Sequence, residues 1–285
     1  MESTEHRLGL EHLAGCLALS KSANWNQNEA DWRLMLGFGR GRGVSMADGT
    51  LAASTLVLPY GKDFAWVAMV LVLPEHRRKG YATQLLRTAL AALKLEGRTA
   101  ILDATPAGHA VYVREGFRDT WGFKRYALGV LPKVFSADEE VRSIDKTDWP
   151  QILRLDLRAF GASREVLLRN LAARMPQAAL VAQRRGELAG FVLGRDGREA
   201  NQVGPLIARD EETATALLAA AVGRAQAPVY VDIADHAPAL QAWALARGFE
   251  FQRPFTRMVH GDTGKTAVAP GDASLVFCPA GPELG

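Results

Sequence analysis

Three basic residues followed by a glycine form the most chemically informative segment of the chain. An apolar stretch over 67–73 leads into Arg77, Arg78, Lys79 and Gly80, and apolar side chains at helical spacing follow. A strand-loop-helix unit of this kind aims backbone N–H groups and the positive end of the helix dipole at one point. Glycine has no Cβ to keep a ligand away. The combination suits the binding of a pyrophosphate.

The same segment differs from the common mononucleotide loops. The chain has no GxxxxGK[ST] segment and no GxGxxG segment after an expected strand. A second glycine-rich run, GFGRGRGV over 37–44, precedes an expected strand instead of opening a helix. We therefore interpret 37–44 as a flexible connection.

Composition narrows the class of protein. The chain has 285 residues, of which 48% are hydrophobic and 23% charged, as in globular proteins of about two domains. A net charge of +3 argues against bulk binding of nucleic acid. The longest uncharged apolar run, 64–73, is too short for a membrane-spanning helix of about 20 residues, and no signal peptide is visible. We expect a soluble, cytoplasmic protein without a nucleic-acid or membrane partner.

Metal and disulfide chemistry find little support in the sequence. The six histidines are scattered, and neither HExxH nor CxxC occurs, so we predict no metal. Cys16 and Cys278 lie near opposite ends of the chain. A disulfide between them is possible, but two buried free thiols in a reducing compartment fit better.

Hydrophobic periodicity predicts a mixed α/β chain in two halves. In the first half we expect helices at 10–20, 28–36, 81–96 and 106–115, and strands at 43–47, 50–58, 64–73, 99–104 and 122–130. In the second half we expect helices at 147–159, 163–173, 210–224 and 237–246, strands at 178–183, 187–194, 200–207, 228–233, 249–251 and 255–260, and one more strand in the tail. The polar segment 131–140 between the halves is typical of a linker.

The two halves echo each other at their ends. Asp103 closes an expected strand, and a helix then leads to Gly116 and Phe117; Asp232 and the pair Gly248-Phe249 repeat the arrangement. We therefore predict two copies of one α/β unit. The expected domains are residues 1–130 and 141–285, joined by the linker 131–140.

Two motifs in the first half resemble those of a known superfamily. Residues 77–82 read Arg-x-x-Gly-x-Ala after a strand, which resembles the acyl-CoA signature Gln/Arg-x-x-Gly-x-Gly/Ala of the GNAT N-acetyltransferases. Tyr112-x-x-x-Gly-Phe is similar to the other recurrent GNAT motif. The whole chain resembles bacterial tandem-GNAT proteins with a divergent C-terminal GNAT-like domain. The resemblance implies an α/β (α+β) fold in which each domain has a mixed, mostly antiparallel central sheet flanked by helices.

The resemblance also implies acetyl-CoA as co-substrate and a set of residues that hold it. Backbone groups of Val70 and Val72 would pair with the pantetheine arm, and one of their N–H groups would polarise the thioester carbonyl. Backbone amides over 78–83 would hold the pyrophosphate. The implied cofactor-binding residues are Val70, Val72, Arg77, Arg78, Lys79, Gly80, Tyr81, Ala82 and Thr83.

Tyr112 matches the superfamily's tyrosine that protonates the departing CoA thiolate. A phenol is neutral at pH 7 and can donate to sulfur. A packed aromatic residue on an amphipathic helix is the alternative. The superfamily often has Asn early in this helix, whereas this chain has Thr105 followed by Pro106.

The acceptor amine must lose a proton, so a general base or a water relay is required. Asp103 is our first candidate for the base, with Glu29, Asp31 and His109 as further candidates; each could instead be structural or solvated. The family builds its acceptor pocket where this chain has Trp25-Asn26-Gln27 before an acidic helix, so we expect Trp25, Asn26 and Glu29 to bind the acceptor. A helix cap with surface side chains is the alternative interpretation.

The second half lacks the chemistry of the first. Its corresponding turn carries Asp210-Glu211-Glu212 instead of basic residues, and Ala244 stands at the tyrosine position. Acidic side chains there would repel CoA, although they are also ordinary first-turn residues of a helix. We expect a catalytically silent second domain.

The sequence therefore predicts an acetyl-CoA-dependent N-acetyltransferase that moves an acetyl group directly to a primary amine in a ternary complex. The acceptor would be a small molecule or a peptide. The alternative is a non-catalytic acyl-CoA-binding or regulatory module, which would bind the cofactor without turnover.

Overall fold

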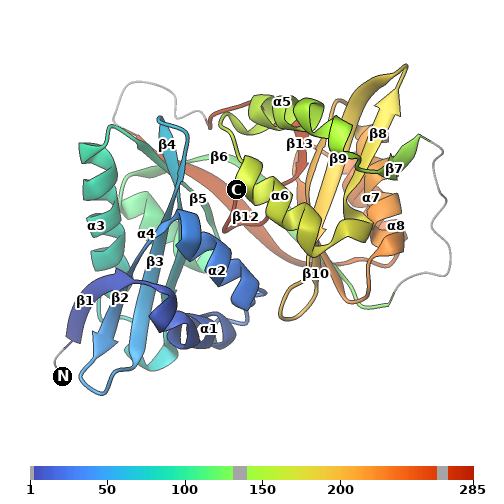
Figure 1. Cartoon of the computed structure of the whole chain (residues 1–285). Coiled ribbons are helices and arrows are strands. Elements are labelled where there is room, and N and C mark those ends of the chain that lie inside the picture. The colour runs from blue at the N-terminus through green and yellow to red at the C-terminus, as the bar shows by residue number, and fades with distance from the viewer. Residues whose placement is uncertain (1–2, 131–139, 262–268) are drawn as a thin grey trace.

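Two α/β halves share one continuous sheet in the computed structural model, which describes residues 3–130, 140–261 and 269–285 (Figure 1). The first half contains β1 (Ser3–Leu8), α1 (Leu13–Ser22), α2 (Glu29–Phe38), β2 (Arg40–Met46), β3 (Leu51–Tyr60), β4 (Phe64–Val72), α3 (Tyr81–Leu95), β5 (Thr99–Ala104), α4 (Pro106–Arg114) and β6 (Phe117–Leu128). The second half contains β7 (Val141–Ser143), α5 (Trp149–Phe160), α6 (Glu165–Arg174), β8 (Leu180–Arg184), β9 (Glu187–Arg195), β10 (Asn201–Ala208), α7 (Glu211–Arg224), β11 (Val229–Ala234), α8 (Pro238–Ala246), β12 (Glu250–His260) and β13 (Val276–Cys278). These α-helices match the expected ones to within a few residues.

The sheet is mixed and mostly antiparallel, which confirms the expected fold class. Its order is β1-β2-β3-β4-β5-β12-β6-β11-β10-β9-β8-β7, and β13 pairs with β10 outside this path. Two neighbouring pairs are parallel, β4 with β5 and β10 with β11. Each half therefore has one parallel pair at the same place in its order of elements, as the internal echo in the sequence predicts.

Several strands differ from the sequence expectation. Residues 37–44 were expected to be a flexible connection, but α2 runs to Phe38 and 40–44 belong to β2. β6 begins at Phe117 instead of 122, and β7 was not expected. Ser3–Leu8 was not expected to be a strand, because its residues are largely polar; it pairs with β2 at the edge of the sheet, where polar side chains face solvent. Two separate strands were expected at 249–251 and 255–260, but they form the single strand β12, with an irregular register between Phe251 and Arg253. The expected linker 131–140 lies outside the described residues except for Glu140.

The halves exchange strands at the centre of the sheet. β12, from the second half, lies between β5 and β6 of the first, and β6 lies between β12 and β11 (Figure 1). Thr256–Val259 pair with Ile101–Ala104, and Val229–Ala234 pair with Phe123–Leu128. Each half thus completes its sheet with a strand of the other half: β12 extends the first, and β6 extends the second.

An ion pair joins the exchanged strand β12 to β5. Nε and Nη2 of Arg257 donate to the two oxygens of Asp103 at 2.8 and 2.9 Å, and both side chains are buried. The guanidinium carbon lies 4.5 Å from the ring centroid of Trp66 on β4 and 4.3 Å from that of Trp121 on β6. Arg257 is therefore enclosed by three strands of the first half.

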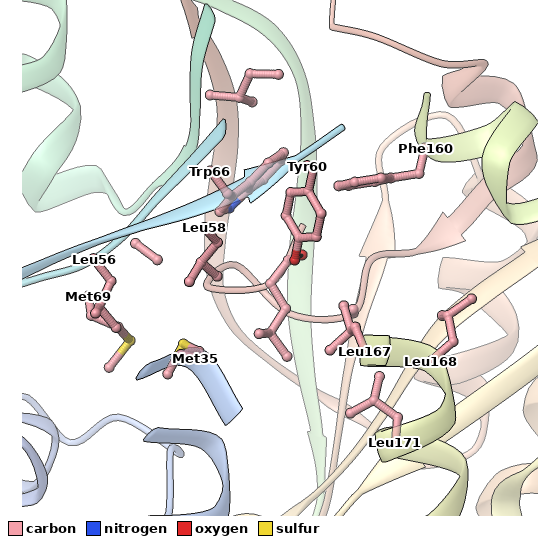
Figure 2. Packing of buried hydrophobic residues seen from close by; sticks show 14 of the residues in the cluster. Met35, Leu56, Leu58, Tyr60, Trp66, Met69, Phe160, Leu167, Leu168 and Leu171 are labelled. Atoms are coloured by element: carbon pink, nitrogen blue, oxygen red, sulfur yellow. Dashed lines mark hydrogen bonds between the residues drawn. The ribbon is translucent and has the colours of Figure 1, made fainter. Parts of the chain in front are cut away.

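A large hydrophobic cluster also crosses from one half to the other (Figure 2). Tyr60 on β3 contacts Phe160 of α5 edge to face, with ring centroids 4.8 Å apart. Leu167, Leu168 and Leu171 on one face of α6 belong to the same cluster. Their spacing of one, three and four residues is that of an amphipathic helix, and the buried apolar area stabilises the contact between halves.

The last residues of the chain pack against β3 and β4. Tyr60 Oη donates to the Leu284 carbonyl at 2.8 Å, and Trp66 Nε1 donates to the Pro282 carbonyl at 3.0 Å. Arg164 also hydrogen-bonds the Gly285 carbonyl. These contacts hold Glu283 in the interior, where its side chain is 2% exposed.

Two further expectations concerned the state of the cysteines and membrane-spanning segments. Cys16 and Cys278 are both buried free thiols, as expected. Within residues 3–130, 140–261 and 269–285, no helix has the length and apolar character needed to cross a membrane.

Loss of Arg257 is expected to destabilise the whole chain. Arg257→Met leaves the Asp103 carboxylate buried without its counter-ion, which should cost about 3–5 kcal/mol of unfolding free energy. Arg158→Met is the matched control, because it removes an exposed pair with Asp272 worth about 0–1 kcal/mol. Urea denaturation of both variants measures the difference.

A double variant tests the physical reason. Asp103→Leu combined with Arg257→Met removes both charges, so it should recover most of the stability lost in Arg257→Met. If Arg257→Met alone is as stable as the Arg158→Met control, the role assigned to this pair is contradicted.

Candidate active site

Strands β4 and β5 part from each other near the basic turn. They pair only where Phe64–Trp66 lie opposite Thr99–Ile101. On its other side β4 stays paired with β3, but the register shifts between Ser54 and Leu56, and Met69 takes a φ of 51°. Ser54 Oγ donates to the Met69 carbonyl at 2.8 Å. This bulge leaves one edge of β4 without a strand partner among the described residues.

Val70 and Val72 lie on that open edge. The Leu73 amide donates to the Ala52 carbonyl on β3 at 2.9 Å. Because backbone groups point alternately to the two sides of a strand, those of Val70 and Val72 face the gap. The Val72 carbonyl accepts a hydrogen bond from Arg77 Nε at 3.2 Å. The backbone amides of the two valines therefore face the space between β4 and β5.

The turn between β4 and α3 presents the N-terminus of a helix. Gly80 precedes α3 with a φ of 87°, and Arg78 has a φ of 59°. No side chain caps α3, so the N–H groups of its first turn point outward without a side-chain partner. Arg77, Arg78 and Lys79 are exposed around this point. The turn thus combines free backbone donors, a helix dipole and three cations, which fits a pyrophosphate.

The first turn of α3 contributes backbone rather than side-chain chemistry. Tyr81, Ala82 and Thr83 are half-buried, and Tyr81 Oη lies 3.9 Å from the sulfur of Met46. The helix is fixed by Leu85 and the other apolar side chains of its buried face. The amides of residues 81–83 are therefore held rigidly at the mouth of the gap.

Tyr112 lies beside the gap on α4. Its ring packs edge to face against the ring of Phe117, with the two ring centroids 5.8 Å apart. It also lies over Gly108, where a Cβ would come within 2.8 Å of the ring. Thr105, the N-cap of α4, accepts a hydrogen bond from the Gly108 amide at 3.3 Å. Burial raises the pKa of Tyr112 to about 12, so the phenol keeps its proton at neutral pH.

Tyr112 and Val70 line one small cavity of about 40 Å³ together with residues from both halves. The first half contributes further residues of β4 and β5, among them Met69 and Leu102. The second half contributes Arg253, Phe255, Pro282 and Glu283. The cavity is therefore completed by the exchanged strand β12 and by the C-terminal segment.

Asp103 lines the cavity, but both of its oxygens are engaged by Arg257. Burial raises the pKa of Asp103, against the opposing effect of the Arg257 guanidinium. Asp103 would have to give up a hydrogen bond from the guanidinium before either oxygen could take a proton. Its role as the general base stays a prediction.

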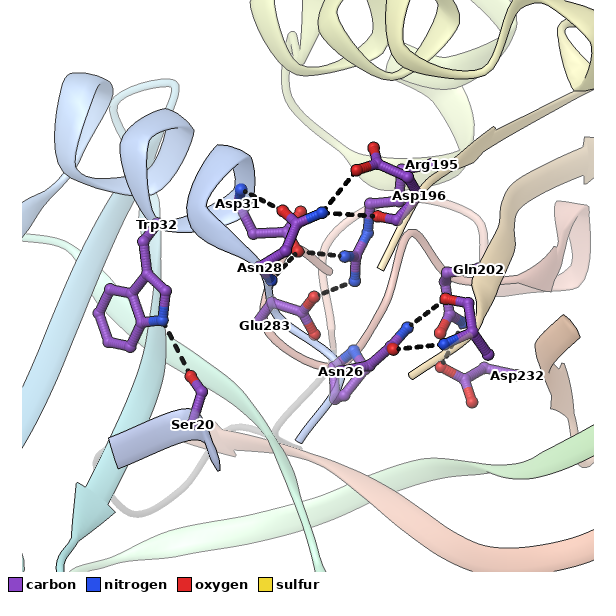
Figure 3. Close-up of polar contacts among 12 residues, drawn as sticks. Ser20, Asn26, Asn28, Asp31, Trp32, Arg195, Asp196, Gln202, Asp232 and Glu283 are labelled. Carbon is purple, nitrogen blue, oxygen red and sulfur yellow. Dashed lines mark hydrogen bonds and ion pairs between the residues drawn. The ribbon is translucent and has the colours of Figure 1, made fainter. Parts of the chain in front are cut away.

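The segment before α2 is divided in its roles. Trp25 lines the cavity, as expected. Asn26 is buried, and its Oδ1 accepts from the amides of Glu199 and Ala200 at 2.8 and 3.0 Å, while its Nδ2 donates to the Ala200 carbonyl at 2.9 Å (Figure 3). The expected acceptor contact of Asn26 is corrected: its amide is used to fasten the β9–β10 loop to the first half.

The remaining candidates lie elsewhere. Glu29 is exposed and accepts from Arg33 Nε at 2.7 Å on the outer face of α2, so the structure corrects its expected place in the acceptor pocket. His109 is hydrogen-bonded to Asp119 at 2.8 Å. Asp31 is buried between Arg174 and Arg195, at 2.6 and 2.7 Å. None of Glu29, His109 and Asp31 lines the cavity.

Glu283 and Gln27 line the cavity but were not among the predicted acceptor-binding residues, although Gln27 belongs to the segment expected to form the acceptor pocket. Glu283 Oε1 accepts from Arg195, whereas its Oε2 is buried without a hydrogen-bond partner among the described residues (Figure 3). Gln27 is 2% exposed, and its Oε1 is likewise buried and unpartnered there. The sequence carried only a weak signal that these residues are buried, namely that Glu283 and Gln27 are polar residues near apolar or proline residues.

The corresponding turn in the second half is filled by the chain itself. Asp210 caps α7 by accepting from the Thr213 amide at 2.7 Å, so the helix N-terminus is already occupied. β10 and β11 pair only over 201–203 of β10, and β13 pairs with β10 where the strands part, at Leu206 and Ile207. A Cβ on Gly204 would lie 2.3 Å from the Pro279 carbonyl oxygen. β13 thus occupies the place that stays open in the first half.

Metal ligation has no visible site. Among the residues that the structure describes, no group of three or more His, Cys, Asp and Glu side chains is arranged to hold a metal ion.

Comparison with known proteins agrees with this geometry. The model of the acetyltransferase (GNAT) family matches residues 13–117, and a model of an acetyltransferase (GNAT) domain matches residues 152–268. Together the two matches span more than three quarters of the chain. The chain therefore belongs to the GNAT acetyltransferases and carries two GNAT domains in tandem.

Relatives of similar length support this assignment. The chain is 25% identical over 246 residues to the uncharacterized N-acetyltransferase YitH of Bacillus subtilis, covering 85% of this chain and 86% of YitH. A crystal structure of a candidate acetyltransferase from Pyrococcus horikoshii shares the fold with a TM-score of 0.80 at 19% identity, over 99% of this chain and 96% of the other. A tandem GNAT protein from the clavulanic acid biosynthesis pathway has a TM-score of 0.62 at 17% identity, over 93% and 100%.

Spectroscopic titration should detect the shifted Tyr112 phenol. Subtracting the ultraviolet titration of Tyr112→Phe from that of the unchanged protein should leave one tyrosine that ionises at about pH 12. In the unfolded chain the same phenol ionises near 10. Between these values the folded state keeps a proton that the unfolded state releases, so Tyr112 should lower stability as pH rises from about 10 to 12. If the difference between the two titrations shows a tyrosine that ionises near pH 10, the burial of Tyr112 is contradicted.

Proposed function

We propose that this protein is an acetyl-CoA-dependent N-acetyltransferase that transfers an acetyl group directly to a primary amine in a ternary complex. The supporting observation is that the open edge of β4 and the protonated Tyr112 line one cavity, and that the uncapped N-terminus of α3 follows this strand edge in the chain. The two GNAT family matches support the same reaction class.

The basic turn would hold the cofactor's pyrophosphate. Backbone amides over 78–83 would donate to the phosphate oxygens, and Gly80 allows the close approach. Arg77, Arg78 and Lys79 add charge at the surface. The amides of Val70 and Val72 would pair with the pantetheine arm along the open edge of β4.

The chemical step would then use Val70 and Tyr112. The Val70 amide donates to the thioester carbonyl oxygen and stabilises the negative charge that forms there when the amine nitrogen attacks. As the carbon–sulfur bond breaks, Tyr112 donates its proton to the departing sulfur. The acceptor nitrogen gives up one proton during its attack, and a water in the cavity is the simplest carrier for it.

The second half would serve the first without catalysis of its own. Its helix N-terminus is capped by Asp210 and its strand gap is filled by β13, which leaves no room for a cofactor. Ala244 replaces the tyrosine. We propose residues 1–130 and 141–285 as the two domains, a cytoplasmic location, and a small-molecule or peptide amine as the acceptor.

Isothermal titration with acetyl-CoA tests the binding site. Arg78→Glu should weaken acetyl-CoA binding about tenfold or more, because it places a negative charge beside the phosphates. Arg209→Glu is the matched control: it makes the same charge change just before α7, at the filled turn of the second half, and should leave the Kd unchanged. A folded wild-type protein that does not bind acetyl-CoA would refute the proposal.

Replacement of Tyr112 separates catalysis from mere binding. Tyr112→Phe should lower kcat for CoA release by about 100-fold or more, the effect of losing a general acid, with an unchanged Kd for acetyl-CoA. Tyr126→Phe is the control, since its hydroxyl hydrogen-bonds Gln241 and Tyr126 does not line the cavity, so kcat should stay unchanged. Binding without turnover, and no effect of Tyr112→Phe, would favour the non-catalytic acyl-CoA-binding module.

A further inference from the structure

One arginine of the cavity has no counter-ion. Arg253 on β12 is half-buried and makes no hydrogen bond or ion pair with any residue of the described chain; its guanidinium carbon lies 5.9 Å from the ring centroid of Phe255. The fully buried arginines behave differently. Arg125 next to it, for example, donates to both oxygens of Asp232 at 2.8 and 2.7 Å. The Arg125–Asp232 pair is neutral, so Arg253 adds one uncompensated positive charge to the lining of the cavity.

The environment of Arg253 is unfavourable to that charge. Burial lowers the pKa of Arg253, and the neighbouring Arg125 lowers it further. A guanidinium partly removed from water is stabilised by an anion that can accept two parallel hydrogen bonds, as a carboxylate does. No residue that the structure describes supplies such an anion, so a carboxylate of a ligand fits beside Arg253.

Glu283, which also lines the cavity, belongs to a group of opposite charge. It forms a connected set of three carboxylates with Asp31 and Asp196 that shares two guanidiniums, Arg174 and Arg195. Figure 3 shows Glu283, Asp31, Asp196 and Arg195 of this set. Three negative and two positive groups leave one excess negative charge.

Two buried oxygens of cavity-lining residues have no hydrogen-bond partner in the described chain: Oε2 of Glu283 and Oε1 of Gln27. An unpartnered buried acceptor is costly, and an amino group would satisfy it. The lining of one cavity therefore combines an unpaired guanidinium with two unpartnered acceptor oxygens, one of them of a carboxylate.

We infer that the acceptor is a small zwitterionic amino acid, whose carboxylate binds Arg253 and whose amino group is held by Glu283 Oε2 and Gln27 Oε1 beside Tyr112 and Val70. The inference rests on the proposed acetyl transfer and names its substrate class. The cavity of about 40 Å³ suits a group of a few heavy atoms. Placed this way, the amino nitrogen lies in the same cavity as the strand edge that would present the thioester.

Matched acceptors test the carboxylate requirement. Proteinogenic α-amino acids and straight-chain ω-amino acids are each compared with the corresponding carboxamide, by CoA release and by calorimetric titration in the presence of CoA. At least one acid should exceed its own amide about tenfold or more in kcat/KM and in affinity, because the amide lacks the charge that pairs with Arg253.

Variants assign the effect to the guanidinium. Arg253→Gln should abolish the preference for acid over amide while the Kd for acetyl-CoA stays unchanged. Arg247→Gln, an exposed arginine of the same half that does not line the cavity, should keep the full preference. A weakened Kd for acetyl-CoA in Arg253→Gln would assign the guanidinium to the cofactor and overturn the inference.

The outcomes separate this inference from the proposed function. If amines without a carboxylate are acetylated as well as the acids, or if no amino acid binds to protein that binds acetyl-CoA, the inference is wrong and the acetyltransferase proposal stands on its own tests. If acetyl-CoA does not bind at all, the proposed function fails first. Preserved acid preference in Arg253→Gln would also refute the role of this residue.

Discussion

The ion pair between Asp103 and Arg257 is the interaction on which the rest of the site depends. It joins the exchanged strand β12 to β5, and the enclosing rings of Trp66 and Trp121 keep the guanidinium away from water. Two charges so deeply buried are tolerated only as a pair, which fixes the register of β12 against β5. That register carries Arg253 and the neighbouring positions of β12 to the cavity. The catalytic half is therefore incomplete without a strand from its partner half.

The C-terminal segment links the two halves in a second way. β13 fills the strand gap of the second half, and the residues that follow cross to β3 and β4 of the first. Hydrogen bonds from Tyr60 and Trp66 fix that crossing, and Glu283 enters the cavity between them. One short segment thus closes the gap that would otherwise resemble a second cofactor site and supplies an acid to the first. The divergence of the second half is in this sense structural as well as chemical.

The net charge of the chain does not show where its buried charges lie. The chain as a whole is only slightly basic, yet its buried arginines are concentrated at the boundary of the two halves, each beside a carboxylate. The exceptions are unpaired groups of two cavity-lining residues, the guanidinium of Arg253 and Oε2 of Glu283. An unpaired polar group costs more free energy in surroundings of low polarity than in water. These two unpaired groups are therefore the best indication of what the cavity binds.

The sequence by itself determined the local elements and the cofactor turn. Apolar periodicity and glycine stops located the helices, and Arg-x-x-Gly-x-Ala after an apolar strand located the turn, because these signals act between residues close in the chain. The roles of Val70, Val72 and Tyr112 remain predictions that the geometry favours. Only the tertiary structure decided the strand exchange, the engagement of Asn26 and Asp103, and the arrival of Glu283 and Arg253 in the cavity. Those contacts join residues more than 100 positions apart, and pairing between distant strands depends on shape and burial that no local pattern records.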